Sequence, residues 1–308
     1  MRIVSLFPSG TEVVVELGLA RNLVGISHQC TWPPEVQHLP RVTDDMLGVQ
    51  GSPRDVSLAI GRLQEEGLPV YTVNARRLAE LQPDVVLTQV VCDVCAVPEQ
   101  QVLATVDDVV PDARVLTMDV VRLGDIMDNI LAAGAALGVE DRAQEVVQRM
   151  ESRLEAIRRR VAGRRRPRIF IVEWTEPIIC SGHWIPDLVE TAGGHSLLTK
   201  PGAPSRVVDW SEVVEAAPEI LLVIPCGCSL DEGVRDAASL ARLPGWHQLP
   251  AVQAGQVFIL DGSVCARHGP RTVDVAETFA HIFHPDAFSG ESPPTPVISW
   301  QDAYGEAS

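Results

Sequence analysis

The chain has 308 residues, of which 46% are hydrophobic, and its formal net charge is −16. This length is enough for two ordinary domains or one large one. The negative charge argues against binding of nucleic acid or an anionic membrane surface through the overall field, and no apolar run approaches the roughly eighteen residues of a membrane span.

The first half of the chain alternates short apolar runs with amphipathic segments. MRIVSLFPSGTE reads as a first strand and turn, without the basic and apolar regions of a secretory signal, and we therefore expect a cytoplasmic protein. Ser9 or Thr11 is the expected N-cap of the first helix. SPRDVSLAIGRLQEEG predicts a helix that begins after Ser52 and ends at Gly67. Further strands are predicted at LVGIS, PVYTV, DVVLT and RVLTM.

A long helical pattern follows, interrupted at Gly138 and Val139, and it ends in Gly163. The alternation then restarts. Strands are expected at RIFIV, EILLVI and QVFIL, and helices at WIPDLVETAGG, DWSEVVEAAP and RTVDVAETFAHIF. Alternating strands and helices are typical of parallel sheets covered by helices.

These patterns predict an α/β fold of two Rossmann-like lobes with parallel sheets, bridged by a long helix. We place the N-terminal lobe at 1–118, a helical connector at 119–167 and the C-terminal lobe at 168–285. The last segment, 286–308, is rich in Pro, Ser, Gly and Glu and predicts a loose tail.

The cysteines all follow predicted strands, where ligands bind in open α/β sheets. They are Cys30, Cys92, Cys95, Cys180, Cys226, Cys228 and Cys265. One interpretation is that they are small buried apolar side chains, which would place them within strands and helices. The other is a metal site in a cleft between the lobes. For that site we predict Cys30, Cys92, Cys95 and Cys226 as ligands, with Cys180, Cys228 and Cys265 as possible further ones.

The pair in TQVVCDVCAV is compatible with several chemistries. CDVCAVPEQQV runs into a predicted helix, as redox CxxC motifs do, although the rest of the chain is unlike thioredoxin. A zinc knuckle uses two local pairs to clamp a small fold, which a domain of this size does not need. Four thiolates from convergent loops would hold an iron–sulfur cluster. A soft metal ion, or the cobalt of a corrinoid, also accepts thiolate or imidazole.

Imidazole and indole side chains lie on the same predicted loops. The histidines are His28, His183 and His268, and the tryptophans are Trp32, Trp174 and Trp184. The histidines are candidate ligand-binding residues, and the tryptophans would either pack the loops or form a flat apolar wall for a macrocycle. Ser9, in FPSGTE, would either serve a plain capped turn or help helix N-terminal amides to bind an anion.

Several segments resemble, in order, the class III solute-binding proteins that capture vitamin B12, ferric siderophores and haem for import. They are RIVSLFPSGTEVVVELGLARNLVGIS, LAELQPDVVLTQ, SEVVEAAPEILLVI and GPRTVDVAETFAHIFHP. SHQCTWP, TQVVCDVCAV, EWTEPIICSGHW and IPCG resemble a signal-less branch labelled cobalamin-binding. The resemblance implies a two-lobed binding protein with a corrinoid as candidate ligand.

Two positions depart from this resemblance. In exported cobalamin binders, one glutamate in each lobe docks onto arginines of the membrane permease. Arg76 stands at the first of these positions, and the second falls near Ser211, with Glu212 one residue away. A like charge facing the permease arginines would repel them, so we expect no docking onto an ABC permease.

The sequence therefore favours a cytosolic binding protein, and not an enzyme, for a small metal-containing, corrinoid-like ligand in a cysteine-lined interlobe cleft. The alternative is a protein that carries its own thiolate-bound metal or iron–sulfur cluster there, with a redox or metal-handling role. An interaction module is a third possibility. The sequence does not name the metal.

Overall fold

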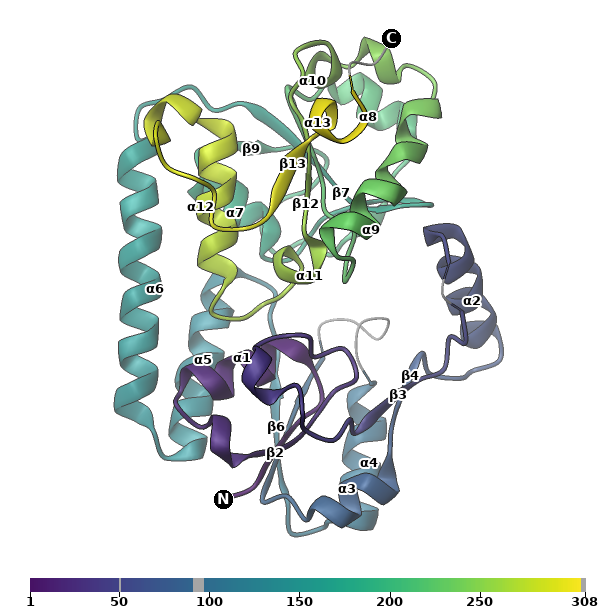
Figure 1. Cartoon of the computed structure of the whole chain (residues 1–308), viewed down its shortest axis with the longest axis vertical. Helices are drawn as coiled ribbons and strands as arrows, with labels where there is room; N and C mark the ends of the chain where they lie inside the picture. The colour runs from purple at the N-terminus through teal and green to yellow at the C-terminus, as the bar shows by residue number, and fades with distance from the viewer. Residues whose placement is uncertain (50, 91–96, 306–308) are drawn as a thin grey trace. The chain divides into compact units, whose positions relative to one another are not determined.

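The computed structural model describes residues 1–49, 51–90 and 97–305 (Figure 1). Its internal contacts divide the chain into two units, which we describe separately. The N-terminal lobe comprises Met1–Gly51, Asp55–Val120 and Gly124–Arg149, and the C-terminal lobe comprises Ser52–Arg54, Val121–Leu123 and Met150–Ser308. None of the described helices is both long and apolar enough to cross a bilayer.

The N-terminal lobe is built on a parallel sheet with strand order β2-β1-β5-β6. The strands are β1 (Ile3–Ser5), β2 (Leu23–Ile26), β5 (Val85–Gln89) and β6 (Arg114–Met118). Their apolar residues are buried because helices cover the sheet, and Val4, Val86 and Leu87 are fully inaccessible. These helices are α1 (Pro8–Glu16), α3 (Ala75–Leu81) and α4 (Glu99–Val109). The predicted parallel sheet is thus confirmed in this lobe.

One predicted strand of this lobe lies outside the main sheet. PVYTV contains β4 (Tyr71–Val73), which pairs antiparallel with β3 (Thr43–Asp45). The helix between these two strands is α2 (Pro53–Glu65), within the predicted bounds. The strand β3 was not predictable from the sequence, because its residues, TDD, have low strand propensity. It forms only through pairing with β4.

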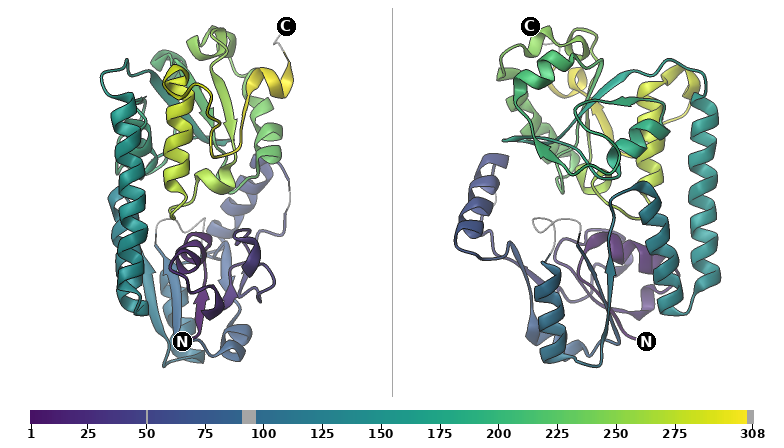
Figure 2. Two further views of the ribbon diagram at one scale, coloured as in Figure 1. Left: turned by 60° about the vertical axis from the view of Figure 1, so that its left-hand side comes forward. Right: turned by 180° about the vertical axis from the view of Figure 1, so that it is seen from behind.

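The predicted helical connector forms two helices, α5 (Leu123–Leu137) and α6 (Glu140–Val161). The break falls at Gly138, whose φ of +72° suits glycine. The long helix α6 is shared by both units, which divide it between Arg149 and Met150. In the C-terminal lobe, Arg153 of α6 forms ion pairs with Asp274 and Glu277 of the neighbouring α12 (Thr272–Phe283; Figure 2).

The C-terminal lobe has a sheet with strand order β10-β8-β7-β11-β12-β13, and β9 (His195–Ser196) also pairs with β7. Its centre is parallel and consists of β7 (Arg168–Thr175), β11 (Ile220–Val223) and β12 (Val257–Leu260). The outer strands β8 (Ile178–Cys180), β10 (Arg206–Val207) and β13 (Val297–Ser299) pair antiparallel with their neighbours. The predicted parallel arrangement therefore describes the centre, and the complete sheet is mixed.

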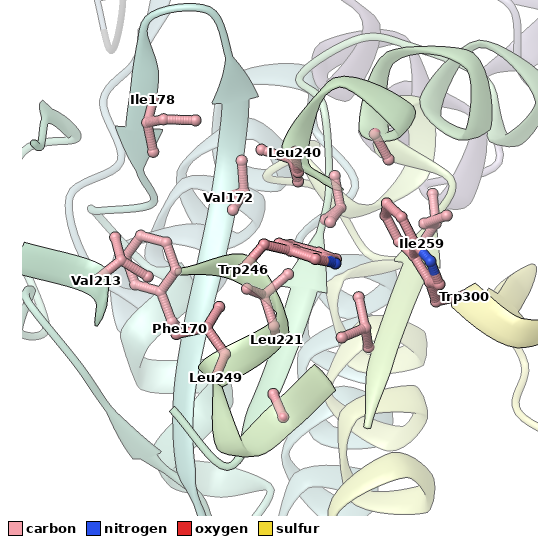
Figure 3. Close-up of a cluster of buried hydrophobic side chains, with 14 of the residues drawn as sticks. Phe170, Val172, Ile178, Val213, Leu221, Leu240, Trp246, Leu249, Ile259 and Trp300 are labelled. Carbon is pink, nitrogen blue, oxygen red and sulfur yellow. The ribbon is translucent and has the colours of Figure 1, made fainter. Parts of the chain in front are cut away.

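Helices and 3₁₀ turns complete the two lobes. The remaining helices of the C-terminal lobe are α7 (Ile185–Thr191), α8 (Trp210–Ala216), α9 (Leu230–Ala237), α10 (Pro250–Gln253), α11 (Gly262–Cys265) and α13 (Trp300–Tyr304). The 3₁₀ turns are Ala20–Asn22, Pro34–Val36, Ala238–Arg242, Trp246–Gln248 and Pro285–Phe288. The core of this lobe packs around Phe170, Leu221 and Trp246, which come from β7, β11 and a 3₁₀ turn (Figure 3).

The prediction of a loose tail over 286–308 is wrong for its described part. β13 extends the sheet, and Trp300 at the start of α13 is only 7% exposed, with its ring centroid 4.7 Å from that of Trp246. Arg160 of α6 lies over the ring of Phe288 at 3.9 Å and forms an ion pair with Glu291. A few aromatic and charged contacts thus order a segment whose overall composition is typical of a loop.

Candidate functional site

In the N-terminal lobe, the loop after β2 carries several predicted site residues. His28 lies two positions beyond the strand end, and its Nδ1 is 2.7 Å from Oγ1 of Thr43. Thr43 Oγ1 also accepts the backbone N–H of His28 at 3.0 Å and donates to Ser27 Oγ at 3.0 Å. The imidazole ring packs against Tyr71, with centroids 5.0 Å apart. The His28 side chain is therefore anchored on one side by a threonine hydroxyl and on the other by an aromatic ring.

Arg41 fixes the backbone of the same loop. Its guanidinium donates to the carbonyl oxygens of Ser27 at 3.1 Å and Cys30 at 2.9 Å, and to Oε1 of Gln37 at 2.7 Å. Trp32 follows within this loop, and it is 45% exposed. An exposed indole on a fixed loop provides a flat apolar surface for a ligand.

Ser9 and Cys30 are both buried in this lobe. The first helix is N-capped by Phe7 with Pro8 at its first position, so the prediction of a Ser9 or Thr11 cap is wrong; the proline already fits the helix start. The Ser9 side chain is 2% exposed. Cys30 is inaccessible to solvent, and its Sγ lies 3.1 Å from Oγ1 of Thr11.

In the C-terminal lobe, Glu173 lies near the end of β7 and organises a polar cluster. Its Oε2 accepts the hydroxyl of Ser205 at 2.7 Å, and Ser205 Oγ in turn accepts the backbone N–H of Gly182 at 3.0 Å. Burial raises the pKa of the Glu173 carboxyl, and hydrogen bonds from Ser205, Ser181 and Gly182 oppose that rise. The cluster ties β7 to the turn before α7.

That turn carries His183 and Trp184. His183 has a φ of +53°, which is uncommon for a residue with a side chain. Its backbone is held on both sides, since His183 N donates to Ala203 O at 2.6 Å and Gly202 N donates to His183 O at 3.0 Å. A conformation of this kind persists only where its surroundings enforce it, and such positions cluster at ligand sites.

Trp184 and His268 pack edge to face, with ring centroids 5.3 Å apart. Both side chains are buried, and burial lowers the pKa of His268 to about 3, so this imidazole is neutral at physiological pH. The buried Nε1 of Trp184 has no hydrogen-bond partner among the described residues. Trp174, at the end of β7, is half-buried and donates its Nε1 proton to the carbonyl of Glu176 at 3.1 Å.

The thiols do not follow the pattern that we predicted. Cys180 is the last residue of β8 and Cys265 the last of α11, and both are buried, which fits small apolar side chains. Burial raises the pKa of Cys180 to about 12 and that of Cys265 further. Cys226 and Cys228, after β11, are half-buried, and burial raises the pKa of Cys228 to about 12. Without a bound cation, these three perturbed thiols are therefore protonated at neutral pH.

The predicted metal site gains no support from the described residues. No group of three or more His, Cys, Asp or Glu side chains in the described ranges is placed to hold a metal ion. The part of this prediction that rests on Cys92 and Cys95 lies outside the described residues. A thiolate-bound metal or an iron–sulfur cluster thus has no structural basis in the part of the chain that is described.

Several residues that shape these loops were absent from the sequence-based prediction. Thr43, Arg41 and Ser205 act through contacts between segments far apart in the chain, so no local pattern reveals them. Glu173 could have been noticed in the sequence, because it is an acidic residue that directly follows the apolar run IFIV of a predicted strand. A charged residue within a buried strand warrants attention because burial of an unpaired charge is unfavourable.

The free energy of unfolding should depend on pH through the Glu173 carboxyl. Because its pKa is raised above the usual 4.5, the folded state binds the proton more tightly than the unfolded state. Stability linked to this group is therefore greatest at low pH, and it falls as pH rises from about 4.5 through the raised pKa. Glu173→Gln, which removes the charge, should lose this pH dependence and gain stability relative to the wild type at pH 8.

Chemical denaturation of the wild type and Glu173→Gln at several pH values would measure this difference. Glu215→Gln is the matched control, because Glu215 is exposed on α8. A stability difference between Glu173→Gln and the wild type that stays constant from pH 4.5 to pH 8 would contradict the assignment of a raised pKa.

The two positions compared with permease-docking glutamates lie on helix surfaces. Arg76, on α3, is highly exposed and pairs with Glu80 at 3.0 Å. Ser211 is exposed in the first turn of α8, and Glu212 pairs with Arg206 at 3.0 Å while its carboxylate caps the backbone of Asp209. The absence of docking onto a permease stays a prediction.

Comparison with known proteins places the chain in a family. A family model described as "Periplasmic binding protein" matches residues 3–264. An uncharacterized ABC transporter substrate-binding lipoprotein of Bacillus subtilis is 25% identical over 93% of this chain and 81% of its own length. A vitamin B12-binding protein of Vibrio cholerae is 24% identical over 90% of this chain and 86% of its own length.

Solved structures show the same fold. A periplasmic heme binding protein from Pseudomonas aeruginosa superposes with a TM-score of 0.73 at 21% identity, covering 97% of this chain and 98% of that chain. The periplasmic vitamin B12 binding protein of Vibrio cholerae gives a TM-score of 0.67 at 22% identity, covering 94% and 98%. The predicted two-lobed solute-binding fold is therefore confirmed.

The predicted cytoplasmic location is wrong. Both of these solved structures are described as periplasmic, and the Bacillus relative is described as a lipoprotein. The prediction rested on the residue types of the first segment, MRIVSLFPSGTE, and those residues belong to β1 and α1 of the fold. Residues that form a strand and a helix of the fold give no information on the cellular compartment of the protein.

Proposed function

The chain belongs to the periplasmic binding protein family, and on that premise we propose that it is the substrate-binding protein for a corrinoid. The curated relatives named vitamin B12-binding proteins, from Vibrio and Salmonella, support this ligand class. The solved structures add haem and iron compounds as competing ligands, because neighbours of similar fold are described as heme-binding and as possibly iron-binding.

The charge of the chain is the observation that favours a corrinoid over haem. The formal net charge is −16, and Asp44 and Asp45 lie close enough to His28 to influence its pKa. Haem carries two carboxylates, whereas the corrinoid periphery consists of neutral amides around a cationic cobalt centre. A negatively charged chain disfavours a ring with two peripheral carboxylates and tolerates a neutral or cationic ring.

The loops at the strand ends supply the apolar component of such a site. We propose Ser9, His28 and Trp32 in the N-terminal lobe, and Trp174, His183, Trp184 and His268 in the C-terminal lobe, as the residues that serve ligand binding. Trp32 offers an exposed indole, while the buried Ser9, Trp184 and His268 would act by supporting the residues around them. Indole rings match the flat face of a macrocycle.

A thermal-shift panel tests the ligand class. Cyanocobalamin, haemin and a ferric hydroxamate siderophore would each be added to the purified protein at the same concentration. Ligand at about one hundred times Kd stabilises the folded state by about 2.7 kcal/mol, so a corrinoid should raise Tm clearly. A rise with haemin or siderophore but not with corrinoid would reject the proposed ligand.

A further inference from the structure

The hydrogen bonds around His28 determine which ring nitrogen carries the proton. Thr43 Oγ1 donates its one proton to Ser27 Oγ at 3.0 Å. It accepts the backbone N–H of His28 at 3.0 Å and faces the ring Nδ1 at 2.7 Å. Since a hydroxyl has one proton and two lone pairs, a Thr43 hydroxyl that donates to Ser27 accepts in this last bond, and Nδ1 is its donor.

The neutral ring therefore carries its lone pair on Nε2. The ring is only partly buried, and Tyr71 packs against it at 5.0 Å. A neutral imidazole with Nδ1–H bonded to a protein oxygen and Nε2 as the basic atom is the arrangement of metal-coordinating histidines.

We propose that His28 Nε2 coordinates the metal centre of the bound ligand at an axial position, an inference that rests on the corrinoid ligand proposed above. The macrocycle fills the four equatorial positions of the metal, so one protein donor is sufficient. In the binding step, the Nε2 lone pair forms a bond to cobalt and one axial water leaves. The oxidation state does not change, and no proton is transferred.

Thr43 and Arg41 are positioning residues in this arrangement. Thr43 fixes the tautomer and the ring orientation through its hydroxyl. Arg41 fixes the loop backbone on either side of His28 by bonding to the carbonyls of Ser27 and Cys30. Groups that orient a metal-binding histidine typically change metal affinity by about 10- to 100-fold when they are removed.

A matched pair of corrinoids distinguishes coordination of cobalt by His28 from binding of the corrinoid ring itself. Aquocobinamide has an exchangeable axial water, whereas dicyanocobinamide has the same ring with both axial positions filled by cyanide. Wild-type protein should bind both and should shift the visible absorption bands of aquocobinamide alone. His28→Ala should abolish the shift and lower the affinity for aquocobinamide at least about tenfold, with little effect on the affinity for dicyanocobinamide.

Two further variants complete the test. His38→Ala, which removes an exposed histidine outside the network, should retain the shift. Thr43→Val keeps the size of the side chain and removes the hydroxyl, so it should weaken aquocobinamide binding by about tenfold with His28 still present. Circular dichroism checks that each variant is folded, and binding of dicyanocobinamide provides a second check for His28→Ala.

The possible outcomes distinguish this inference from the proposed function. A band shift that persists in His28→Ala would overturn the role of His28, and so would corrinoid binding by the wild type without any shift. If the wild type binds neither cobinamide, the proposed corrinoid function fails, and the inference fails with it.

Discussion

Replacing Trp300 with alanine should lower the free energy of unfolding by about 3–5 kcal/mol, the usual range for removal of a buried tryptophan. Trp300 is 7% exposed, and its ring centroid lies 4.7 Å from that of Trp246 (Figure 3). The ring of Tyr304 lies 4.3 Å away on the same centroid measure. Loss of the Trp300 side chain would leave a cavity beside Trp246, which is itself 1% exposed. Chemical denaturation followed by far-ultraviolet circular dichroism measures the change.

The matched control is Val207→Ala on strand β10 of the same lobe. Val207 is 58% exposed, so its truncation should change stability by no more than about 0.5 kcal/mol. An equally small effect of Trp300→Ala would mean that the C-terminal segment does not contribute to the core.

Gly182→Ala should weaken ligand binding by about tenfold or more, equivalent to at least about 1.4 kcal/mol. A Cβ atom at this position would lie 2.4 Å from backbone atoms of Ala203, Pro204 and Ser205. Backbone cannot move aside as a flexible side chain can, so the turn that carries His183 and Trp184 must shift. Overpacking of this kind also lowers stability, by about 1–3 kcal/mol.

Gly61→Ala is the appropriate control for this substitution. Gly61 lies within α2, and a Cβ there would meet nothing within 4 Å. Alanine in an exposed helix is favoured over glycine by about 0.5–1 kcal/mol, so the control should be neutral or slightly stabilising. Corrinoid affinity would be measured for both variants by equilibrium dialysis, and unchanged affinity in Gly182→Ala would exclude the turn from the binding site.

The central strands and the longer helices were predictable because their sequence signals are local. β5, β7 and β11 contain the buried apolar runs VVL, IFIV and ILLV, and α12 repeats its apolar residues at helical spacing. The strands β3, β10 and β13 are short, and their residues become strands only through pairing with distant segments. Local patterns carry no information on such pairing.

The loops that carry the candidate site residues were predictable, but the contacts of these residues were not. The rule that ligand-binding residues follow strand ends placed His28 and His183 on loops that the structure fixes tightly. The same rule failed for Cys180 and Cys265, which lie at the ends of a short strand and a short helix that the sequence did not reveal. The tautomer of His28 depends on Thr43, fifteen residues away, and only the folded chain brings the two together.

Titration calorimetry of the wild-type protein with aquocobinamide tests the central claim most directly. We expect saturable binding with one corrinoid per chain and with a negative heat-capacity change, because the macrocycle buries apolar surface against the indole rings. Haemin titrated under the same conditions should bind more weakly because its carboxylates oppose the acidic surface. No measurable heat of saturable binding with aquocobinamide at several temperatures, or tighter binding of haemin, would contradict the assignment of a corrinoid as the ligand.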